Sequence, residues 1–222
     1  MENSKMKSAI LSLALLLSFI AIPDINAQTF RYGVQAGMNL CNPQVADKSD
    51  YTDGRVFYPL VSFGVNGYFS IKSNSFWGLS VEPGFIRKGG THHNIRIFTD
   101  GKLYSPQDFK YISNYIQLPL FADFYVTDKL YISAGPELAY HLNSKAKGEY
   151  LTEDISDNYK RLELSGSVRL TYSLLRNLDC ALTYNHGLTS SSEIEWADEL
   201  YNAIGISKVY NQYFQVLLRF TF

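Results

Sequence analysis

The sequence predicts an all-β fold, an eight-stranded antiparallel transmembrane β-barrel with short periplasmic turns and four long extracellular loops. Three observations lead to this fold class. Eight segments carry a large apolar residue at every second position, long and short connections alternate between them, and the opposite face carries charges of both signs. A period of two marks a strand with two different faces, and an even number of such strands joined in this way is typical of outer-membrane barrels.

The start of the chain has the features of an export signal. Two lysines precede the apolar run 9–22, and Ala27 provides a small residue before a cleavage point. A cationic start, an apolar stretch and a small residue at the cut are typical of a secretory signal peptide, whereas a membrane anchor usually needs about 20 apolar residues. We therefore predict a signal peptide over residues 1–27, removed after Ala27, and a single outer-membrane β-barrel domain over residues 28–222.

The first four strand segments alternate clearly. Residues 30–40 alternate aromatic, branched or other apolar residues with arginine, glycine, glutamine and asparagine. Residues 57–71 set phenylalanine, valine and isoleucine against serine, glycine and asparagine. Residues 76–88 set tryptophan, leucine and valine against glycine, serine, glutamate and lysine, and residues 109–126 set isoleucine, leucine and phenylalanine against glutamine and aspartate. Each segment therefore predicts a strand with one apolar and one polar face.

The last four segments repeat the pattern. Residues 129–142 alternate leucine, isoleucine and alanine with serine, glycine, glutamate and histidine. Residues 160–174 alternate leucine and valine with arginine, glutamate, serine and threonine. Residues 178–188 alternate leucine and tyrosine with aspartate, threonine and asparagine, and residues 214–222 place an arginine in the middle of an aromatic and branched run. These segments complete the eight predicted strands.

Connections of two lengths separate the segments. The tight ones are residues 72–75, 127–128 and 175–177. The others are 16 to 20 residues long and cover residues 41–56, 89–108, 143–159 and 189–208. A soluble β-sandwich has no reason to place all its long loops at one end, whereas outer-membrane barrels do so. The segments also exceed the roughly 9–11 tilted residues that cross the hydrocarbon layer.

The polar faces carry ten charged residues, five of each sign, and His186 is the one ionisable residue expected on an apolar face. The ten are Arg31, Glu82, Lys88, Asp123, Glu137, Arg161, Glu163, Arg169, Asp179 and Arg219. Buried in a soluble sandwich, unpaired charges would cost several kcal/mol each, whereas across a barrel lumen they can pair. Because eight strands leave an interior just wide enough for side chains, we expect a paired network that plugs the lumen and no general diffusion pore.

The C-terminal segment is expected to close the barrel against the first segment, so that no sheet edge is left in lipid. Its aromatic residues Phe220 and Phe222 resemble the signal by which the barrel-assembly machinery recognises its substrates, which makes that machinery an expected partner. Outer-membrane lipid is the expected partner of the apolar face. Aromatic girdles are expected at Phe69, Trp77, Phe124 and Phe222 on the periplasmic side and at Tyr58, Tyr115, Tyr140 and Tyr210 on the outer side.

Composition excludes several functional classes. The formal net charge is -1, so no nucleic-acid partner is expected. Cys41 and Cys180 fall near opposite ends of the predicted topology, so we expect no disulfide between them. His92 and His93 are adjacent but lack further ligands for a metal ion. We therefore expect neither a metal site nor a cofactor.

Four short stretches resemble a known family. They are "YIQLPLFADFY" from Tyr115, "GPELAYHL" from Gly135, "LTYNHGL" from Leu182 and "KVYNQYFQVLLRF" from Lys208. In order and spacing they are similar to the PorT-like outer-membrane beta-barrel proteins, a porin-family group of the Gram-negative Bacteroidetes. The resemblance implies a barrel in the outer membrane. Because some members take part in a secretion and gliding apparatus, it also suggests such a role, but it brings no functional residues with it.

These observations favour a non-enzymatic protein with a structural or surface-interaction role. The acidic, aromatic stretches "KGEYLTEDISDNY" and "SSEIEWADELYN" would lie outside the cell, where they could bind an envelope or extracellular protein. Three alternatives stay open at this point. They are an accessory component of an outer-membrane secretion apparatus, a narrow porin-like channel, and an outer-leaflet lipid-modifying hydrolase that uses His186.

Overall fold

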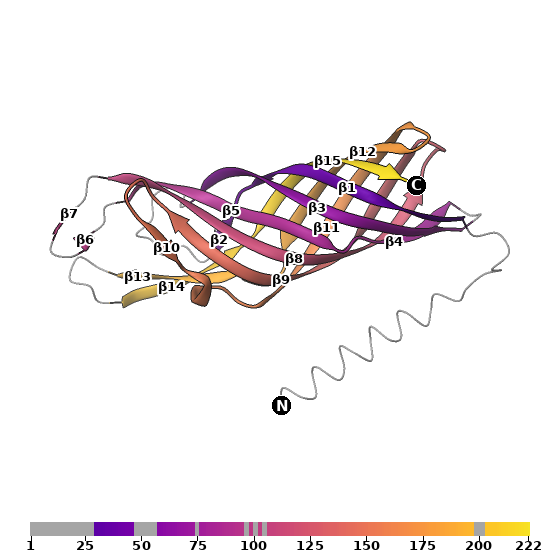
Figure 1. The fold of residues 1–222 in the computed structure, drawn as a ribbon. Helices are drawn as coiled ribbons and strands as arrows, with labels where there is room; N and C mark the ends of the chain where they lie inside the picture. The colour runs from indigo at the N-terminus through magenta and orange to yellow at the C-terminus, as the bar shows by residue number, and fades with distance from the viewer. Residues whose placement is uncertain are drawn as a thin grey trace, which may run out of the picture.

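Eight strand positions form the wall of the barrel, which Figure 1 shows from the side. They are β1 (Thr29–Cys41), β3 (Tyr58–Lys72), β4 (Trp77–Val81) continued by β5 (Gly84–Ile95), β8 (Gln107–Tyr125), β9 (Leu130–Lys147), β11 (Leu162–Leu175), β12 (Leu178–Gly187) and β15 (Gln212–Thr221). This computed structural model describes residues 29–46, 57–73, 76–95, 98–99, 102–103, 106–197 and 203–222. Among these residues, no helix has both the length and the apolar character to span a membrane. The predicted signal peptide lies outside the described residues.

The wall strands pair antiparallel around a closed ring. Their order is β1–β3–β4/β5–β8–β9–β11–β12–β15, and β15 returns to pair with β1 along the stretch that ends at Gly33↔Thr221. At the end of the chain, the Phe222 amide donates to the Tyr32 carbonyl at 2.9 Å. Closure removes the free edges of the sheet, as backbone in hydrocarbon requires. The eight-stranded antiparallel barrel predicted from the sequence is confirmed.

The third wall position departs from the single strand predicted over residues 76–88. Glu82 and Pro83 interrupt it and leave β4 five residues long, because proline has no N–H to give to the ladder. The Glu82 amide instead donates to the Pro119 carbonyl at 3.0 Å, and the Gly67 amide donates to the Pro83 carbonyl at 2.8 Å. The wall therefore stays continuous across the break.

The two ends of the barrel differ as the connection lengths predict. Short turns join β3 to β4, β8 to β9 and β11 to β12, and the C-terminus lies at this end (Figure 1). The remaining elements belong to the long connections: β2 (Gln44–Ala46), β6 (Phe98–Thr99), β7 (Lys102–Leu103), β10 (Thr152–Asp154), η2 (Ser156–Asn158), β13 (Ser192–Ala197) and β14 (Ala203–Tyr210). By the usual pattern of such barrels, the short-turn end is periplasmic and the other end is extracellular.

The extracellular end holds more strand than the sequence predicts. β9 continues to Lys147, inside a segment assigned to a loop, and β5 continues to Ile95. β13 and β14 form a hairpin, and β2 joins its edge to make a small three-stranded sheet. The long connections are therefore partly extensions of the wall, because polar strands can keep pairing beyond the hydrocarbon layer.

Side chains alternate between lumen and outer surface along the wall strands. Leu170 is 46% exposed on the outer surface, whereas the preceding residue, Arg169, is 2% exposed in the lumen. Large apolar side chains are exposed on every wall strand except β4 and β5, whose outward apolar residues are half-buried. Contact with hydrocarbon explains this large exposed apolar surface. The outer girdle needs one correction. Tyr115 faces the lumen and is fully buried, because it alternates with the outward Ile116.

The two cysteines lie on opposite faces of the wall. Cys41 is buried in the lumen, whereas Cys180 alternates with the inward Asp179 and faces outward. On the shared neighbour β15, Cys41 pairs with Tyr213 and Cys180 with Leu218. Five residues of strand separate these two levels, which is roughly 17 Å. Both thiols are free.

Candidate functional site

Eight of the ten charged residues predicted for the lumen have their side chains in the closed interior of the barrel. Each is at most 2% exposed. They are Glu82, Lys88, Asp123, Glu137, Glu163, Arg169, Asp179 and Arg219. Six of them form two groups: a periplasmic cluster of Glu82, Arg169 and Arg219, and an extracellular cluster of Lys88, Glu137 and Glu163.

Glu82 is the centre of the periplasmic cluster. It lies at the break between β4 and β5, and its Oε1 accepts hydrogen bonds from Arg169 Nη1 and, at 2.8 Å, from Arg219 Nη2. Its Oε2 accepts a third hydrogen bond from Gln35 Nε2 at 2.5 Å. One carboxylate thus neutralises part of the charge of two arginines, in a site closed to bulk water.

The two arginines of this cluster are held by further contacts. Arg219 Nε donates to Gln35 Oε1 at 2.9 Å, and its Nη1 donates to the Tyr131 hydroxyl. Its guanidinium also lies 3.6 Å from the centre of the Tyr68 ring. Arg169 Nε donates to Thr183 Oγ1 at 2.8 Å. These planar, multiply bonded guanidiniums are fixed in position, which suits arginine better than lysine.

Lys88 is the centre of the extracellular cluster. Its Nζ lies 3.1 Å from Glu137 Oε1 and 2.9 Å from Glu163 Oε1. The Tyr213 hydroxyl donates to Glu137 Oε2 at 2.6 Å, and Asn211 Nδ2 donates to Glu163 Oε2 at 2.6 Å. Both carboxylates therefore use both oxygens, and the single lysine is shared between them.

These contacts cross the lumen instead of running along its wall. Arg169 on β11 and Arg219 on β15 each lie three strand positions from Glu82, in opposite directions around the ring. Tyr213 on β15 also lies three positions from Glu137 on β9. In a ring of eight strands the greatest separation is four positions. The two clusters therefore cross-brace the interior at two levels and fill it with side chains, as eight-stranded barrels do.

The predicted pairing of five cations with five carboxylates is wrong. Of the five predicted cations, three are enclosed, one lysine and two arginines, and three glutamates are paired with them. Asp123 Oδ1 accepts a hydrogen bond from Ser133 Oγ at 2.6 Å. Within the described part of the chain, neither carboxylate oxygen of Asp179 has a hydrogen-bond partner, although the residue is fully buried. Among the described residues, neither aspartate is hydrogen-bonded to a cation, although Asp179 lies in register with Arg219 on β15.

The positions of three arginines also differ from the predicted charge pattern. Arg161 is exposed and lies just before β11, which begins at Leu162. Arg31 is half-buried near the periplasmic end, where its Nη2 donates to Thr221 Oγ1 at 3.3 Å. Arg87 was not foreseen and lies outward between two buried residues, although no arginine was expected on the apolar face. Its Nε donates to Asn114 Oδ1 at 3.1 Å and its guanidinium lies 5.0 Å from the Phe63 ring centre, so polar and aromatic contacts compensate for its position.

The uncharged members of both clusters were not predicted from the sequence. They include Gln35, Tyr115, Tyr131, Asn211 and Tyr213, all buried. Four of them lie on wall strands, at the same inward-facing alternate positions as the charged residues. Their alternation along the strand could therefore have identified them. Asn211 precedes β15 and carried no such signal. Charge alone was too narrow a criterion, because a buried carboxylate needs neutral donors as well as cations.

His186, the residue proposed for lipid hydrolysis, is exposed on the outer face of β12. The residues in register with it are Gly166 on β11 and Gln212, the first residue of β15. Neither side chain can act as a nucleophile or orient the imidazole as a carboxylate would. Its ring stacks with that of Tyr184, with ring centres 6.5 Å apart. These positions supply no catalytic group for a hydrolase.

The adjacent histidines His92 and His93, at which no metal site was expected, contact different residues. His93 Nδ1 lies 2.6 Å from Asp108 Oδ2 across the β5–β8 pair, and His92 packs near the Phe57 ring. Among the described residues, no group of three or more histidine, cysteine, aspartate or glutamate side chains could hold a metal ion. The two histidines therefore point to separate partners.

The predicted assembly signal lies on the lipid-facing surface. Phe220 and Phe222 are 46% and 67% exposed, with ring centres 5.5 Å apart. Phe222 also contacts Tyr32 of the first strand, with ring centres 5.7 Å apart. The terminal aromatics thus form a small exposed group at the seam where the barrel closes.

The extracellular sheet is joined to the wall. Lys160 Nζ donates to Glu193 Oε1 at 2.9 Å and to Ser190 Oγ at 2.6 Å, and Tyr159 forms an isolated bridge with Ser192. The hydrogen bond and the charge of Lys160 lower the pKa of the Glu193 carboxyl. These contacts fix the start of β13 beside the start of β11.

Comparison with known proteins gives a family match and several structural likenesses. The family model described as "Outer membrane protein beta-barrel domain" matches residues 26–193. Among curated proteins, none matches the chain.

Solved structures with similar folds come from several bacteria. Neisserial surface protein A is 14% identical, with 89% of this chain and 100% of that chain covered and a TM-score of 0.49. Ail, the attachment invasion locus protein of Yersinia pestis, is 14% identical, with 86% and 98% covered and a TM-score of 0.44. The outer membrane protein OprG from Pseudomonas aeruginosa is 10% identical, with 88% and 97% covered and a TM-score of 0.39.

Proposed function

Because the chain belongs to the outer membrane protein beta-barrel domain family, we propose that this outer-membrane protein is a plugged barrel that carries a recognition surface outside the cell. In this proposal the lumen has a structural role and conducts nothing. The extracellular strands and loops bind a protein of the envelope or of the surroundings.

The position of Glu82 is the main observation that supports a plugged lumen. Its carboxylate binds arginines that approach from opposite directions around the ring, so their side chains occupy the centre of the lumen. The extracellular cluster repeats this cross-bracing at a second level. An ion path would need continuous water through both levels. The hydrogen-bonded side chains that lie across the lumen oppose such a path.

The recognition surface is supported by the order at the extracellular end. β8 and β9 contain 19 and 18 residues, well beyond the roughly 9–11 that cross hydrocarbon, so both strands project outward. The β13–β14 hairpin, joined through Lys160, presents Ile206 with 59% exposure. Exposed apolar side chains on a fixed polar frame are typical of protein-binding sites.

Conductance tests the plug. The refolded mature chain is inserted into planar bilayers beside Arg169→Ala and the control Val168→Ala, which changes the adjacent outward residue. A heat-modifiable gel shift first verifies that each barrel has folded. We expect no steady conductance from any of the three. Steady conductance that Arg169→Ala alters and Val168→Ala does not would mean that the charges line an ion path and would overturn the proposal.

Site-specific photo-crosslinking tests the recognition surface. A photoreactive residue is placed at Ile206 on the hairpin, and at Val168 on the lipid-facing wall as the control. In intact cells we expect a discrete protein adduct from position 206 alone. A third photoreactive position is the exposed extracellular residue Leu151. If none of the three positions gives a protein adduct, the barrel has a structural role only.

A role as an accessory of an outer-membrane secretion apparatus is the second candidate. It is favoured by the family-like stretches from Tyr115 and Gly135, which lie on the paired strands β8 and β9. Copurification in mild detergent would distinguish the two candidates. A stable complex with envelope secretion proteins favours the accessory role, and isolation as a single species favours the surface role.

A further inference from the structure

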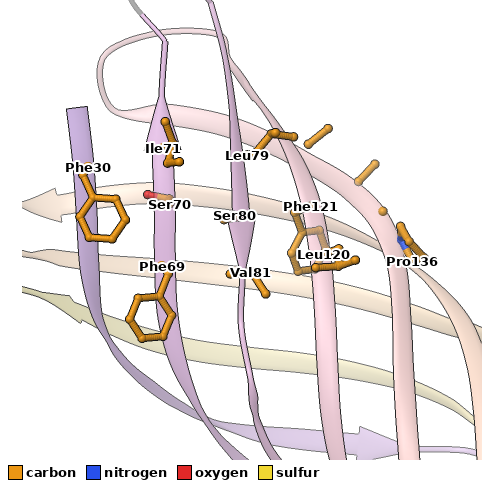
Figure 2. A pocket seen from close by; sticks show the side chains of 13 residues that line it. Phe30, Phe69, Ser70, Ile71, Leu79, Ser80, Val81, Leu120, Phe121 and Pro136 are labelled. Atoms are coloured by element: carbon orange, nitrogen blue, oxygen red, sulfur yellow. The ribbon is translucent and has the colours of Figure 1, made fainter. Parts of the chain in front are cut away.

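The lipid-facing wall contains a groove near its periplasmic end. It has a volume of about 520 Å³ and extends over β4, between β1 and β3 on one side and β8 and β9 on the other. In Figure 2, Phe30 and Phe69 stand on one side of the groove, Leu120 and Pro136 on the other, and Leu79 between them.

The register of the strands explains why the wall is hollow here. One row of outward residues runs around the barrel as Phe30, Ile71, Leu79, Ala122, Ala134 and Val168. Two neighbouring members of this row are alanines. In the next row toward the periplasm, Phe124 pairs with Ile132, and on the extracellular side Leu120 extends from β8. The alanines therefore form a low strip between two rows of large side chains.

Prolines shape the same region. Pairing between β8 and β9 is interrupted between Pro119↔Glu137 and Ala122↔Ala134, because Pro136 and Pro119 lack the N–H that a ladder needs. A Cβ at Gly135 would lie 1.9 Å from the Leu120 carbonyl oxygen, so the two backbones approach closely only because this residue is glycine. The hollow is therefore encoded by specific residues of both strands.

The groove is suited to an apolar ligand. Ser70 and Ser80, its polar lining residues, alternate into the lumen and are buried there, so the open side offers hydrocarbon contacts. Its volume lies within the roughly 300–1,000 Å³ of ordinary ligand sites. A second copy of this convex wall would not fill a recess bordered by projecting side chains.

Depth identifies which lipid lies opposite the groove. Leu79 is two residues, roughly 7 Å along the strand, from Trp77 of the predicted periplasmic girdle. The groove also opens directly into the apolar band that faces hydrocarbon, so its occupant comes from the membrane. We propose that it binds one acyl chain of a phospholipid of the periplasmic leaflet, which stays with the barrel longer than the surrounding lipids do.

Native mass spectrometry of the full mature barrel tests this site. The protein is reconstituted in nanodiscs of phosphatidylethanolamine and phosphatidylglycerol and then released into detergent. Ala134→Phe fills the low strip, whereas the control Val168→Phe adds the same ring at the in-register outward position on β11. We expect one retained phospholipid on the wild type and the control. Retention should fall about tenfold or more in Ala134→Phe, because the added ring occupies the space of the acyl chain and removes its packing contacts with the groove.

The outcomes separate lipid binding from the alternatives. Equal retention by all three proteins, or no retention by the wild type, would overturn the proposal. A dimer of barrels that Ala134→Phe dissociates would assign the groove to a second copy instead. A gel shift verifies folding of each variant, and Ala122→Leu, on the neighbouring strand, provides a second way to fill the groove if Ala134→Phe does not fold.

Discussion

Replacing Glu82 with glutamine removes the one anion that Arg169 and Arg219 share. The substitution keeps the size of the side chain and one carbonyl oxygen, so it leaves the backbone break at Pro83 unchanged. Two guanidiniums then remain fully enclosed with no carboxylate hydrogen-bonded to them. We expect this variant to fold as a barrel that is markedly less stable.

The contacts in the structure set the magnitude. Two arginine donors reach the Glu82 carboxylate, and hydrogen bonds to charged groups contribute about 1.5–3 kcal/mol each. Their sum is an upper bound, because the glutamine oxygen keeps part of one contact. Breaking a buried ion pair by neutralising one partner costs about 3–5 kcal/mol. We therefore expect the free energy of unfolding to fall by about 3–5 kcal/mol.

The assay is reversible urea unfolding from lipid vesicles, followed by tryptophan fluorescence and by the heat-modifiable gel shift. The control is Glu153→Gln, the same chemical change at an exposed glutamate of β10, for which we expect a change close to zero. A loss below about 1 kcal/mol for Glu82→Gln, equal to that of the control, would refute the conclusion that this carboxylate holds the lumen together.

Three further predictions test other parts of the structure. Asp179→Asn should lower the free energy of unfolding by much less than Glu82→Gln does in the same assay, because Asp179 lies in register with Arg219 but its carboxylate accepts no hydrogen bond from the described residues; a loss as large as that of Glu82→Gln would contradict this. The pKa of the Glu193 carboxyl is lowered by Lys160, so their contact is present above the ordinary pKa of 4.5 and is lost as the pH falls through the lower folded value. Hydrogen exchange of β13, corrected for its intrinsic rate, should therefore increase in acid, and Glu193→Gln should remove that step. Deleting Phe222 should slow folding into vesicles that contain the barrel-assembly machinery and leave folding into pure lipid unchanged; equal slowing in both would show a role in stability alone.

Much of the architecture could be predicted from the sequence, because the two faces of a strand depend only on local phase. The alternation through Arg169 and Leu170 fixes one residue in the lumen and the next in lipid, without knowledge of any other strand. The lengths of the connections also predicted the direction of each strand and which end of the barrel carries the long loops. The break at Pro83 was harder to predict, because its neighbours keep the phase of one uninterrupted segment.

By itself, then, the sequence determined the barrel, the even number of strands and the face on which most wall residues lie. Only the tertiary structure decided which of those residues meet. Glu82 binds Arg169 and Arg219, which are 87 and 137 residues away in the chain, while Asp179 has the same inward phase and no hydrogen-bond partner among the described residues. The groove beside Ala134 likewise depends on a row of residues drawn from six strands. Phase is a local property of one strand, whereas depth and partners are set by the stagger at which eight strands close.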